Sequence, residues 1–263
     1  MKKFEGVLLC TDFDQTLGFR GVVSKENCDA IRYFQENGGR FTIISGRHPL
    51  YLKKHQDGFS VNAPLVGYNG ALILDEKTGE ILRSGGRTDM AALDLAEQLW
   101  KREPTLFRIV MHDRTTNSFA CRREPQEDCF LTVQALRERC ELPLYNVLCC
   151  TKEPEEAAVL KDKLTEMAGD RFEIARSWNT GIEIICAQDT KGSAALYLKE
   201  LLGVRLLVTA GDYENDISML RAGDISYAVE NAIPNVKAAA KRHTVSHDKH
   251  AIAAIVAELE KEL

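Results

Sequence analysis

The segment GVLLCTDFDQT, residues 6–16, is the most informative stretch of this 263-residue chain. It begins with a short, continuous apolar run, which is typical of a strand buried on both faces of a parallel sheet. Asp12 and Asp14 follow where that strand ends, and a period of two keeps them on the same side of the chain. Paired carboxylates repel each other, so the site favours a hard cation such as Mg²⁺; an Asp-rich turn that caps a helix has the same composition.

Strand and helix patterns alternate after this segment, as in βαβ units around a parallel sheet. Ser24 is a candidate N-cap for a helix that ends at Gly38-Gly39. Further strands are predicted over residues 41–45, 65–68, 71–74 and 81–83, and a further helix from Pro49.

The rhythm changes in the middle of the chain, where pairs of adjacent strands are flanked by helices. Helices are predicted over residues 89–101, 127–140 and 155–168, and strands over 107–112, 118–122, 144–150, 172–175 and 181–186. Alternation resumes with a helix over 192–201, a strand over 206–210, a helix over 215–222, a strand over 226–229 and two more helices. The prediction is an α/β protein with a Rossmann-like parallel-sheet core, residues 1–83 and 188–263, interrupted by an α+β module, residues 84–187.

Composition excludes several classes of protein. The 34 basic and 39 acidic residues give a net charge of −5, without the basic excess that nucleic-acid binding demands. An apolar content of 44% argues against disorder, and no apolar run is long enough to form a signal peptide or to cross a membrane. The eight cysteines form no CxxC pair, which favours reduced thiols in a cytoplasmic protein.

Two further groups of polar residues fall at the ends of predicted elements of the core. Ser45-Gly46-Arg47 follows the second strand, where a hydroxyl and an unhindered N–H can hold phosphate oxygens. Lys191 opens a helix and could neutralise a phosphoryl group or a carboxylate. Taken alone, the first group is better explained as an ordinary strand-to-helix turn, and Lys191 is better explained as a surface lysine.

A fourth group, GDYEND at residues 211–216, follows the strand over 206–210. Asp212 and Asp216 lie four residues apart and face the same way as a helix begins, which suits one metal ligand and one residue that supports it. Helix capping is the structural alternative.

In this order, the four groups resemble the haloacid dehalogenase superfamily of aspartate-nucleophile phosphohydrolases. The chain is most similar to the Cof-type class IIB branch, in which an α/β cap domain lies between the second and third motifs. The segments YNGA at residues 68–71, GDYENDISML at 211–220 and Asn231-Ala232 also match. The pattern departs where the family usually has Gly at Gln15, Tyr213 and His250 and Thr at Ser45. Ser45 keeps the hydroxyl and with it the expected phosphate contact, whereas the bulkier Gln15 and Tyr213 put the size and approach of the substrate in question.

The resemblance implies a Mg²⁺-dependent phosphatase that acts on a small phosphate monoester. Asp12 would be the nucleophile that becomes an aspartyl phosphate, and Asp14 the general acid and base. The Asp12 carboxylate, the Asp14 backbone carbonyl and Asp212 would hold the metal, with Asp216 orienting the metal site or Lys191. The catalytic set it implies is Asp12, Asp14 and Lys191, and the substrate-binding set is Thr16, Ser45, Gly46, Arg47, Lys191 and Asn215.

The inserted module is expected to act as the cap that selects the substrate. It carries about 14 basic and 18 acidic residues, so its net charge does not attract anions. A sugar phosphate therefore fits better as a substrate than a polyanion. Candidate contacts on its predicted strands are Arg108, Arg122, Trp178 and Glu183.

Several alternatives stay open. A phosphosugar mutase or phosphotransferase would use the same scaffold, and a phospho-receiver-like module or a catalytically silent binding protein would use some of the same residues. A receiver would not need Asp14 and is far shorter than this chain. His243, His247 and His250 have helical spacing, but they lie where a strand and a loop are expected, so a metal site there is disfavoured. We expect a monomer or homodimer with a small-molecule partner and without nucleic acid or membrane.

Overall fold

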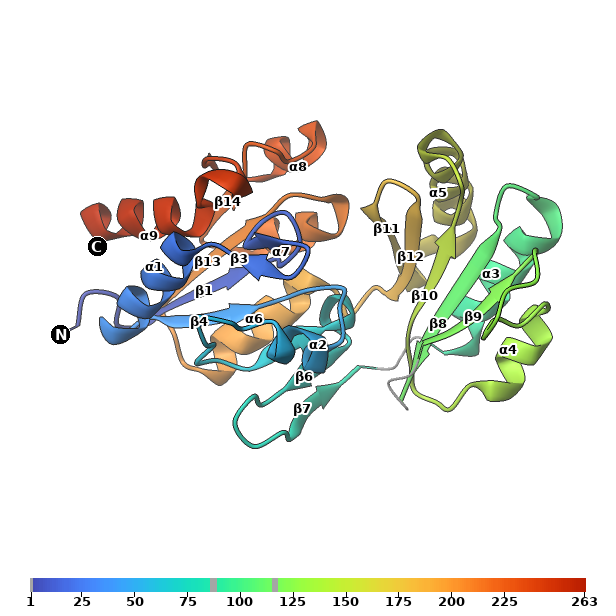
Figure 1. Ribbon diagram of the computed structural model, residues 1–263, viewed down its shortest axis with the longest axis horizontal. Coiled ribbons are helices and arrows are strands. Elements are labelled where there is room, and N and C mark those ends of the chain that lie inside the picture. The colour runs from blue at the N-terminus through green and yellow to red at the C-terminus, as the bar shows by residue number, and fades with distance from the viewer. Residues whose placement is uncertain (1, 86–88, 115–117) are drawn as a thin grey trace. The chain divides into compact units, whose positions relative to one another are not determined.

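The computed structural model describes residues 2–85, 89–114 and 118–263, and the chain divides into two structural units. One, the core unit, consists of Met1–Ser84 and Lys191–Leu263. The other, the inserted unit, consists of Gly85–Thr190. Figure 1 shows both units, with the inserted unit entering the chain after β7 and leaving it before α6.

A five-stranded parallel sheet forms the centre of the core unit, in the order β15-β14-β13-β1-β4. Its strands are β1 (Val7–Thr11), β4 (Arg40–Ile43), β13 (Leu206–Gly211), β14 (Ile225–Ala228) and β15 (Arg242–His243). The central position of β1 explains its apolar sequence, because a strand with neighbours on both edges and helices on both faces has no polar surroundings.

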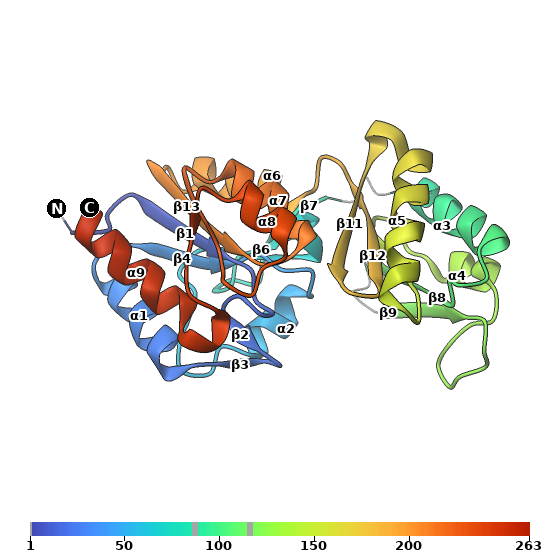
Figure 2. The same cartoon turned by 90° about the horizontal axis from the view of Figure 1, so that it is seen from above.

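Alternate residues of β1 contribute to two different layers of the core. Val7 and Leu9 pack in a cluster with residues of α1 (Lys25–Glu36) and α9 (Ala251–Glu262), which lie side by side in Figure 2. Leu8 and Cys10 pack on the other face with residues of α6 (Lys191–Leu201) and α7 (Ile217–Ala222). The predicted doubly covered parallel sheet is therefore present.

Shorter elements complete the core unit. They are the hairpin β2 (Gly18–Phe19) and β3 (Val22–Val23), helices α2 (Pro49–Lys54) and α8 (Pro234–Ala239), and the antiparallel sheet of β5 (Leu65–Gly67), β6 (Leu72–Leu74) and β7 (Ile81–Ser84). Three short 3₁₀ turns also belong to this unit: η1 (Tyr68–Gly70), η3 (Glu214–Asp216) and η4 (His247–Lys249).

The inserted unit is a five-stranded antiparallel sheet in the order β11-β12-β10-β8-β9. Its strands are β8 (Arg108–Asp113), β9 (Ser118–Arg122), β10 (Leu144–Cys150), β11 (Phe172–Trp178) and β12 (Gly181–Cys186). Helices α3 (Met90–Arg102), α4 (Val133–Arg139) and α5 (Pro154–Ala168) pack with one face of the sheet around a single apolar cluster, and η2 (Gly169–Arg171) follows α5. The insert is thus α+β, as its paired strands predicted.

One predicted helix is wrong in extent. A helix was expected over residues 127–140, but only α4 forms, because Thr132 is its N-cap and its hydroxyl accepts a hydrogen bond from the Ala135 N–H at 3.2 Å. Asp128, with a φ of 59°, lies in the left-handed region and cannot belong to that helix.

The cysteines and the helices bear on two features of the composition. All eight cysteines are free thiols. Among the helices of the described ranges, none has both the length and the apolar character that crossing a bilayer requires.

Helix α6 offers a matched test of the layer on the α6 face of the sheet. Leu198 is 0% exposed and packs in that layer, whereas Leu196 on the same helix is 50% exposed. We expect Leu198→Ala to lower the free energy of unfolding by about 2–5 kcal/mol, because it leaves a cavity, and Leu196→Ala to change it by about 0.5 kcal/mol or less. Urea unfolding of both variants checks this, and equal effects would contradict the packing described.

Candidate active site

The carboxyl ends of neighbouring strands bring the predicted site residues together. Strand β1 lies between β13 and β4, so Asp12, Asp212 and Ser45 follow adjacent strands at one edge of the sheet. The Asp12 N–H continues the sheet pairing by donating to the Ala210 carbonyl at 2.9 Å. This edge is where open α/β sheets bind their ligands.

Lys191 is the central cation of the site. It is the first residue of α6, its side chain is fully buried, and its Nζ donates to Asp12 Oδ1 and to Asp216 Oδ1, both at 2.6 Å. Burial opposes the charged ammonium, but the two carboxylates outweigh it and hold the pKa of Lys191 above its ordinary value. Lys191 therefore stays charged between Asp12 and Asp216, which are 204 residues apart in the chain and follow β1 and β13.

Asp216 is occupied by the protein itself on both oxygens. Oδ1 accepts from Lys191, and Oδ2 accepts from the backbone N–H groups of Asp212 and Tyr213 at 2.9 and 3.0 Å. These bonds shape the loop after β13, so the helix expected over 215–222 begins as η3 and becomes α7 only at Ile217. Gly211 is needed beside it, since a Cβ there would lie 2.5 Å from the Asp216 Cβ.

Asp212 faces the same small space as Asp12. Its Oδ1 accepts from the Thr16 hydroxyl at 2.7 Å, which places Thr16 on the aspartate and not in an open position. Carboxylate oxygens of Asp12, Asp212 and Asp216 all lie within 4.8 Å of one another, and all three residues are buried. Burial raises the pKa of Asp212 to about 8, with Asp12 and Asp216 adding to the effect, and burial raises that of Asp12 to about 7 against the opposing effect of Lys191.

This donor set fits a hard divalent cation. Three buried carboxylates face one ammonium, so negative charge is in excess by count. Burial, with the neighbouring carboxylates adding to it, raises the pKa of Asp12 and of Asp212. Oxygen ligands of this kind suit Mg²⁺ or a similar ion. Because both Asp216 oxygens are already bonded, Asp12 and Asp212 are the better ligands, and Asp216 is better described as a positioning residue.

Asp14 does not join the cluster through its carboxylate. Its two oxygens accept from Arg47 Nε and a terminal Arg47 nitrogen, at 2.9 and 3.1 Å, and the Arg47 guanidinium lies 4.7 Å from the centre of the Tyr51 ring. About a third of the Asp14 side chain stays exposed, so this carboxyl can reach solvent or a ligand. The structure thus places Arg47 on Asp14, where sequence reasoning expected it on the substrate.

The loop that follows Asp14 shows why glycine is usual in the family at the position of Gln15. Gln15 has a φ of 62°, the left-handed region where glycine is most easily accommodated, and this is a position where the family usually has Gly. His250, a second such position, has the same φ of 62°. The Asn231 side chain donates to the Gln15 carbonyl at 2.9 Å and holds the loop in place.

The residues that the sequence indicated as phosphate or substrate contacts lie in the neighbouring loops. Ser45 is buried, and its Oγ accepts from the Arg47 N–H at 3.2 Å, which forms a tight turn through Gly46. Asn215 donates from Nδ2 to Asn69 Oδ1 at 2.9 Å, and both asparagines are buried. The sequence matches the family at Asn69 but indicates no role for it; its place before Gly70 is the only local signal.

The other expected groups lie elsewhere. His243 is in β15, His247 is in η4 and His250 follows it in the left-handed conformation, so the helical spacing of these histidines describes no helix. Within the inserted unit, Arg108, Arg122, Trp178 and Glu183 lie on strands of the antiparallel sheet, as expected.

Comparison with known proteins agrees with this geometry. The model of the haloacid dehalogenase-like hydrolase family matches residues 9–256. YxeH of Bacillus subtilis, which is named as a phosphatase, is 26% identical over 96% of this chain and 97% of its own length. YitU of the same organism, named as a 5-amino-6-(5-phospho-D-ribitylamino)uracil phosphatase, is 25% identical over 95% of this chain and 96% of its own.

Solved structures show the same fold. The subclass IIB sugar phosphatase BT4131 has a TM-score of 0.75 at 18% identity, over 95% of this chain and 98% of its own. BT1666 of Bacteroides thetaiotaomicron has a TM-score of 0.79 at 19% identity, over 98% of this chain and 96% of its own. At these identities the likeness concerns the fold: a parallel-sheet core with an inserted cap of the IIB kind.

The excess negative charge of the three aspartates can be tested through protein stability, without any substrate. The pKa of Asp212 rises from 3.8 to about 8 on folding, so the folded protein binds this proton more tightly than the unfolded chain does. The protonated Asp212 therefore stabilises the fold fully below about pH 4, and this stabilisation is lost as the pH rises to about 8. Asp212→Asn removes this loss and keeps an oxygen for Thr16. In EDTA at pH 8 we expect the melting temperature to rise by roughly 2–6 °C, with a smaller gain at pH 5.

Scanning calorimetry at the two pH values measures this difference, and added Mg²⁺ should then stabilise the parent protein but not the variant. Asp57→Asn, at an exposed position of the same unit, is the matched control. A melting temperature that falls at pH 8, or a gain that does not depend on pH, would contradict the excess of buried charge.

Proposed function

This chain belongs to the haloacid dehalogenase-like hydrolases, and from that premise we propose that it is a Mg²⁺-dependent phosphatase that hydrolyses a small phosphate monoester through a phosphoaspartate at Asp12. The observation that carries the proposal is the pairing of the buried Asp12 carboxylate with Lys191 at 2.6 Å, beside a second buried aspartate. A nucleophile and the charges that would neutralise a phosphoryl group are thereby held in one place.

In the first step Asp12 attacks phosphorus and the ester oxygen leaves. The Lys191 ammonium keeps the Asp12 carboxylate oriented and offers positive charge to the phosphoryl oxygens, which carry the charge of the transition state. The Ser45 hydroxyl and the Gly46 N–H supply neutral donors to the same oxygens, and Asn215 contacts the phosphate or the rest of the substrate. Asp14 gives its proton to the leaving alkoxide.

In the second step water hydrolyses the phosphoaspartate. Asp14 now takes a proton from that water, which is possible because its carboxylate is partly exposed and was deprotonated in the first step. Arg47 holds Asp14 in a fixed orientation by two hydrogen bonds, so it acts as a positioning residue for the general acid and base. Splitting the reaction in two avoids direct attack by water on the ester.

The cation fits the residues that are present. Asp12, Asp212 and the Asp14 backbone carbonyl would hold Mg²⁺, with Asp216 fixing the loop of Asp212 and the position of Lys191. When bound, Mg²⁺ supplies positive charge that lets an anionic carboxylate approach an anionic phosphate. The excess negative charge of the cluster supports this assignment.

We assign the core chemistry to residues 1–83 and 188–263 and substrate selection to the cap, residues 84–187. A sugar phosphate or similar small ester is the proposed substrate class. It is supported by a structural relative titled a sugar phosphatase and by two Bacillus subtilis relatives, YwtE and YitU, named for a substrate with a phosphoribityl group.

The nucleophile is tested by Asp12→Asn, assayed with p-nitrophenyl phosphate. We expect the Mg²⁺-dependent turnover to fall by about 10³-fold or more, because the amide cannot form the phosphoaspartate, while Asp57→Asn keeps parental activity. Release of p-nitrophenolate checks it, with EDTA as the metal-free comparison. Turnover by Asp12→Asn within tenfold of the parent would rule out the assigned nucleophile.

The two roles of Asp14 separate with the same substrate. p-Nitrophenolate leaves without needing a proton, so Asp14→Asn should still form the phosphoaspartate but hydrolyse it about 10²- to 10⁴-fold more slowly. Intact-protein mass spectrometry after rapid quenching should then show one phosphoryl group that hydroxylamine removes. The double variant with Asp12→Asn should show none, and a lack of adduct in Asp14→Asn would argue against its role in the second step.

A further inference from the structure

Two arginines of the inserted unit lie opposite each other on the face of its sheet that the helices do not cover. Residues Ile109, Met111 and Cys121 pack into the cluster shared with α3, α4 and α5. The alternate residues therefore point to the other face, as the separate cluster around Val110 and Ala120 shows. Arg108 and Arg122 belong to that second set, and the register of β8 and β9 pairs them directly.

This pair is electrostatically unfavourable as it stands. Like charges directly across an antiparallel pair of strands repel each other, and both side chains are half-buried. The Nε atoms of both arginines are buried without a hydrogen-bond partner. Within residues 2–85, 89–114 and 118–263, neither guanidinium forms an ion pair; the nearby Glu124 carboxyl, whose pKa is lowered chiefly by Lys152, interacts only weakly with the Arg122 charge.

The surroundings strengthen any bond that these guanidinium groups make. Val110, Ala120, Leu148 and Cys150 form an apolar floor beside them, and Cys150 is the direct neighbour of Arg108 on β10. The Arg122 guanidinium lies 5.3 Å from the centre of the Phe107 ring, which holds its plane in place. Partial removal from water makes charged hydrogen bonds stronger.

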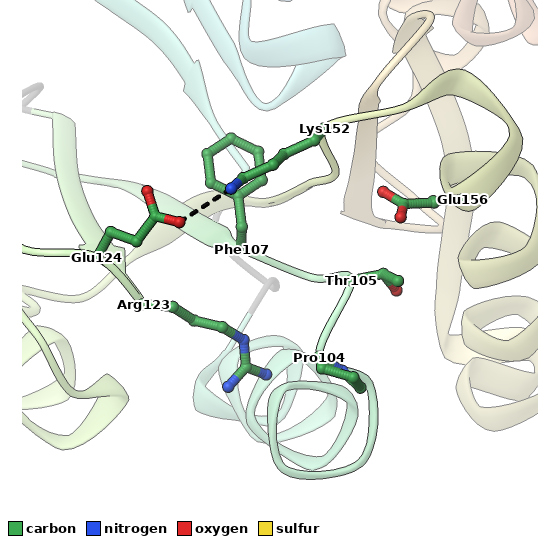
Figure 3. Close-up of a pocket in the computed structure, with 7 residues that line it drawn as sticks. All are labelled: Pro104, Thr105, Phe107, Arg123, Glu124, Lys152 and Glu156. Atoms are coloured by element: carbon green, nitrogen blue, oxygen red, sulfur yellow. Dashed lines mark hydrogen bonds and ion pairs between the residues drawn. The ribbon is translucent and has the colours of Figure 1, made fainter.

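The neighbouring cationic side chains, Arg123 and Lys152, differ from this pair because they already form hydrogen bonds or ion pairs. Arg123 donates to the backbone carbonyls of Leu106 at 2.7 Å and Glu103 at 3.1 Å, and also to that of Trp100. A pocket of about 270 Å³ beside it, shown in Figure 3, contains Lys152, whose Nζ is bonded to Glu124 at 2.9 Å. Charge in this pocket is balanced by acidic residues, so it is a poor candidate for an anion.

The carboxylate of Glu183 on the same open face is also engaged. It accepts from Asn146 Nδ2 at 2.7 Å and from the Ser177 hydroxyl, and Asn146 in turn is bonded to His112 at 2.6 Å. Glu183 is thus held within a hydrogen-bonded row that crosses four strands, from β8 to β11. Its negative charge is not paired with Arg108 or Arg122.

We propose that Arg108 and Arg122 form an anion-binding site for a phosphate or carboxylate group. Two guanidinium forks side by side match the oxygen atoms of such a group, and the anion would bring the two like charges together and satisfy their unbonded N–H groups. The anion is a second charged group of the substrate or a free anion. The first source rests on the proposed phosphatase function and narrows its substrate to phosphate esters with another anionic group.

Matched substrates test the first source. Phosphate release is measured for 3-phosphoglycerate against glycerol 3-phosphate, and for glucose 1,6-bisphosphate against glucose 6-phosphate. In at least one pair, the parent protein should prefer the doubly anionic member by about tenfold or more in kcat/KM, mainly through KM. Arg108→Gln and Arg122→Gln should each reduce that preference about tenfold, which corresponds to about 1.4 kcal/mol.

Two further variants serve as controls for this test. Arg122→Lys keeps the charge without the fork and should retain part of the preference, and Arg139→Gln, an exposed arginine on α4, should retain all of it. Each glutamine variant should unfold at or above the parental temperature, since it relieves a repulsion. A preference that is the same in the parent and in both glutamine variants overturns the substrate-borne source.

The free-anion source is tested without catalysis. Inorganic phosphate in Mg²⁺-free buffer should broaden its ³¹P resonance on addition of the parent protein, and Arg108→Gln with Arg122→Gln should reduce this effect more than Arg139→Gln does. If the parent protein hydrolyses none of the esters but binds phosphate, and the double variant loses that binding, the result would support the anion site and contradict the proposed phosphatase function. Unchanged phosphate binding together with an unchanged substrate preference overturns the site itself.

Discussion

The buried ammonium of Lys191 is the interaction on which the rest of this site depends. It lies between Asp12 and Asp216 at 2.6 Å from each and connects the first strand of the chain with a loop and a helix that follow the insertion. A lysine that is this deeply buried would lose its charge without such partners, and the aspartates would repel each other without it. The three groups are therefore stable only as a set, which also ties the two halves of the discontinuous core together.

The set is nevertheless not neutral. Asp212 adds a third buried carboxylate, and burial, reinforced by repulsion between the carboxylates, raises the pKa values of Asp12 and Asp212. Such an arrangement is costly for a fold that needs only stability, but it prepares oxygen ligands for a cation at the end of β1 and β13. Thr16, Gly211 and the two N–H groups bonded to Asp216 keep the loops in the geometry that this requires.

The inserted unit has a related imbalance of opposite sign. Its acidic residues outnumber its basic ones, yet on the open face of its sheet Arg108 and Arg122 lie together with no carboxylate bonded to them. Net charge averages over a whole unit, whereas recognition of an anion depends on charge at a distance of a few ångströms. The expectation drawn from composition, that a sugar phosphate fits this unit better than a polyanion, is therefore compatible with the proposed local anion site.

The sequence alone indicated the α/β class, the insertion and the polar residues that lie together at one edge of the sheet, because buried strands, caps and polar residues at strand ends are local signals. It did not predict that the helix begins at Val133, which depends on the N-cap at Thr132. It also did not predict the start of α7, which depends on the hydrogen bonds from the loop backbone to Asp216. Only the tertiary structure put Arg47 on Asp14, Asn69 on Asn215 and Arg108 opposite Arg122. These partners are separated along the chain, and sheet order and register, which no local pattern encodes, determine which side chains meet.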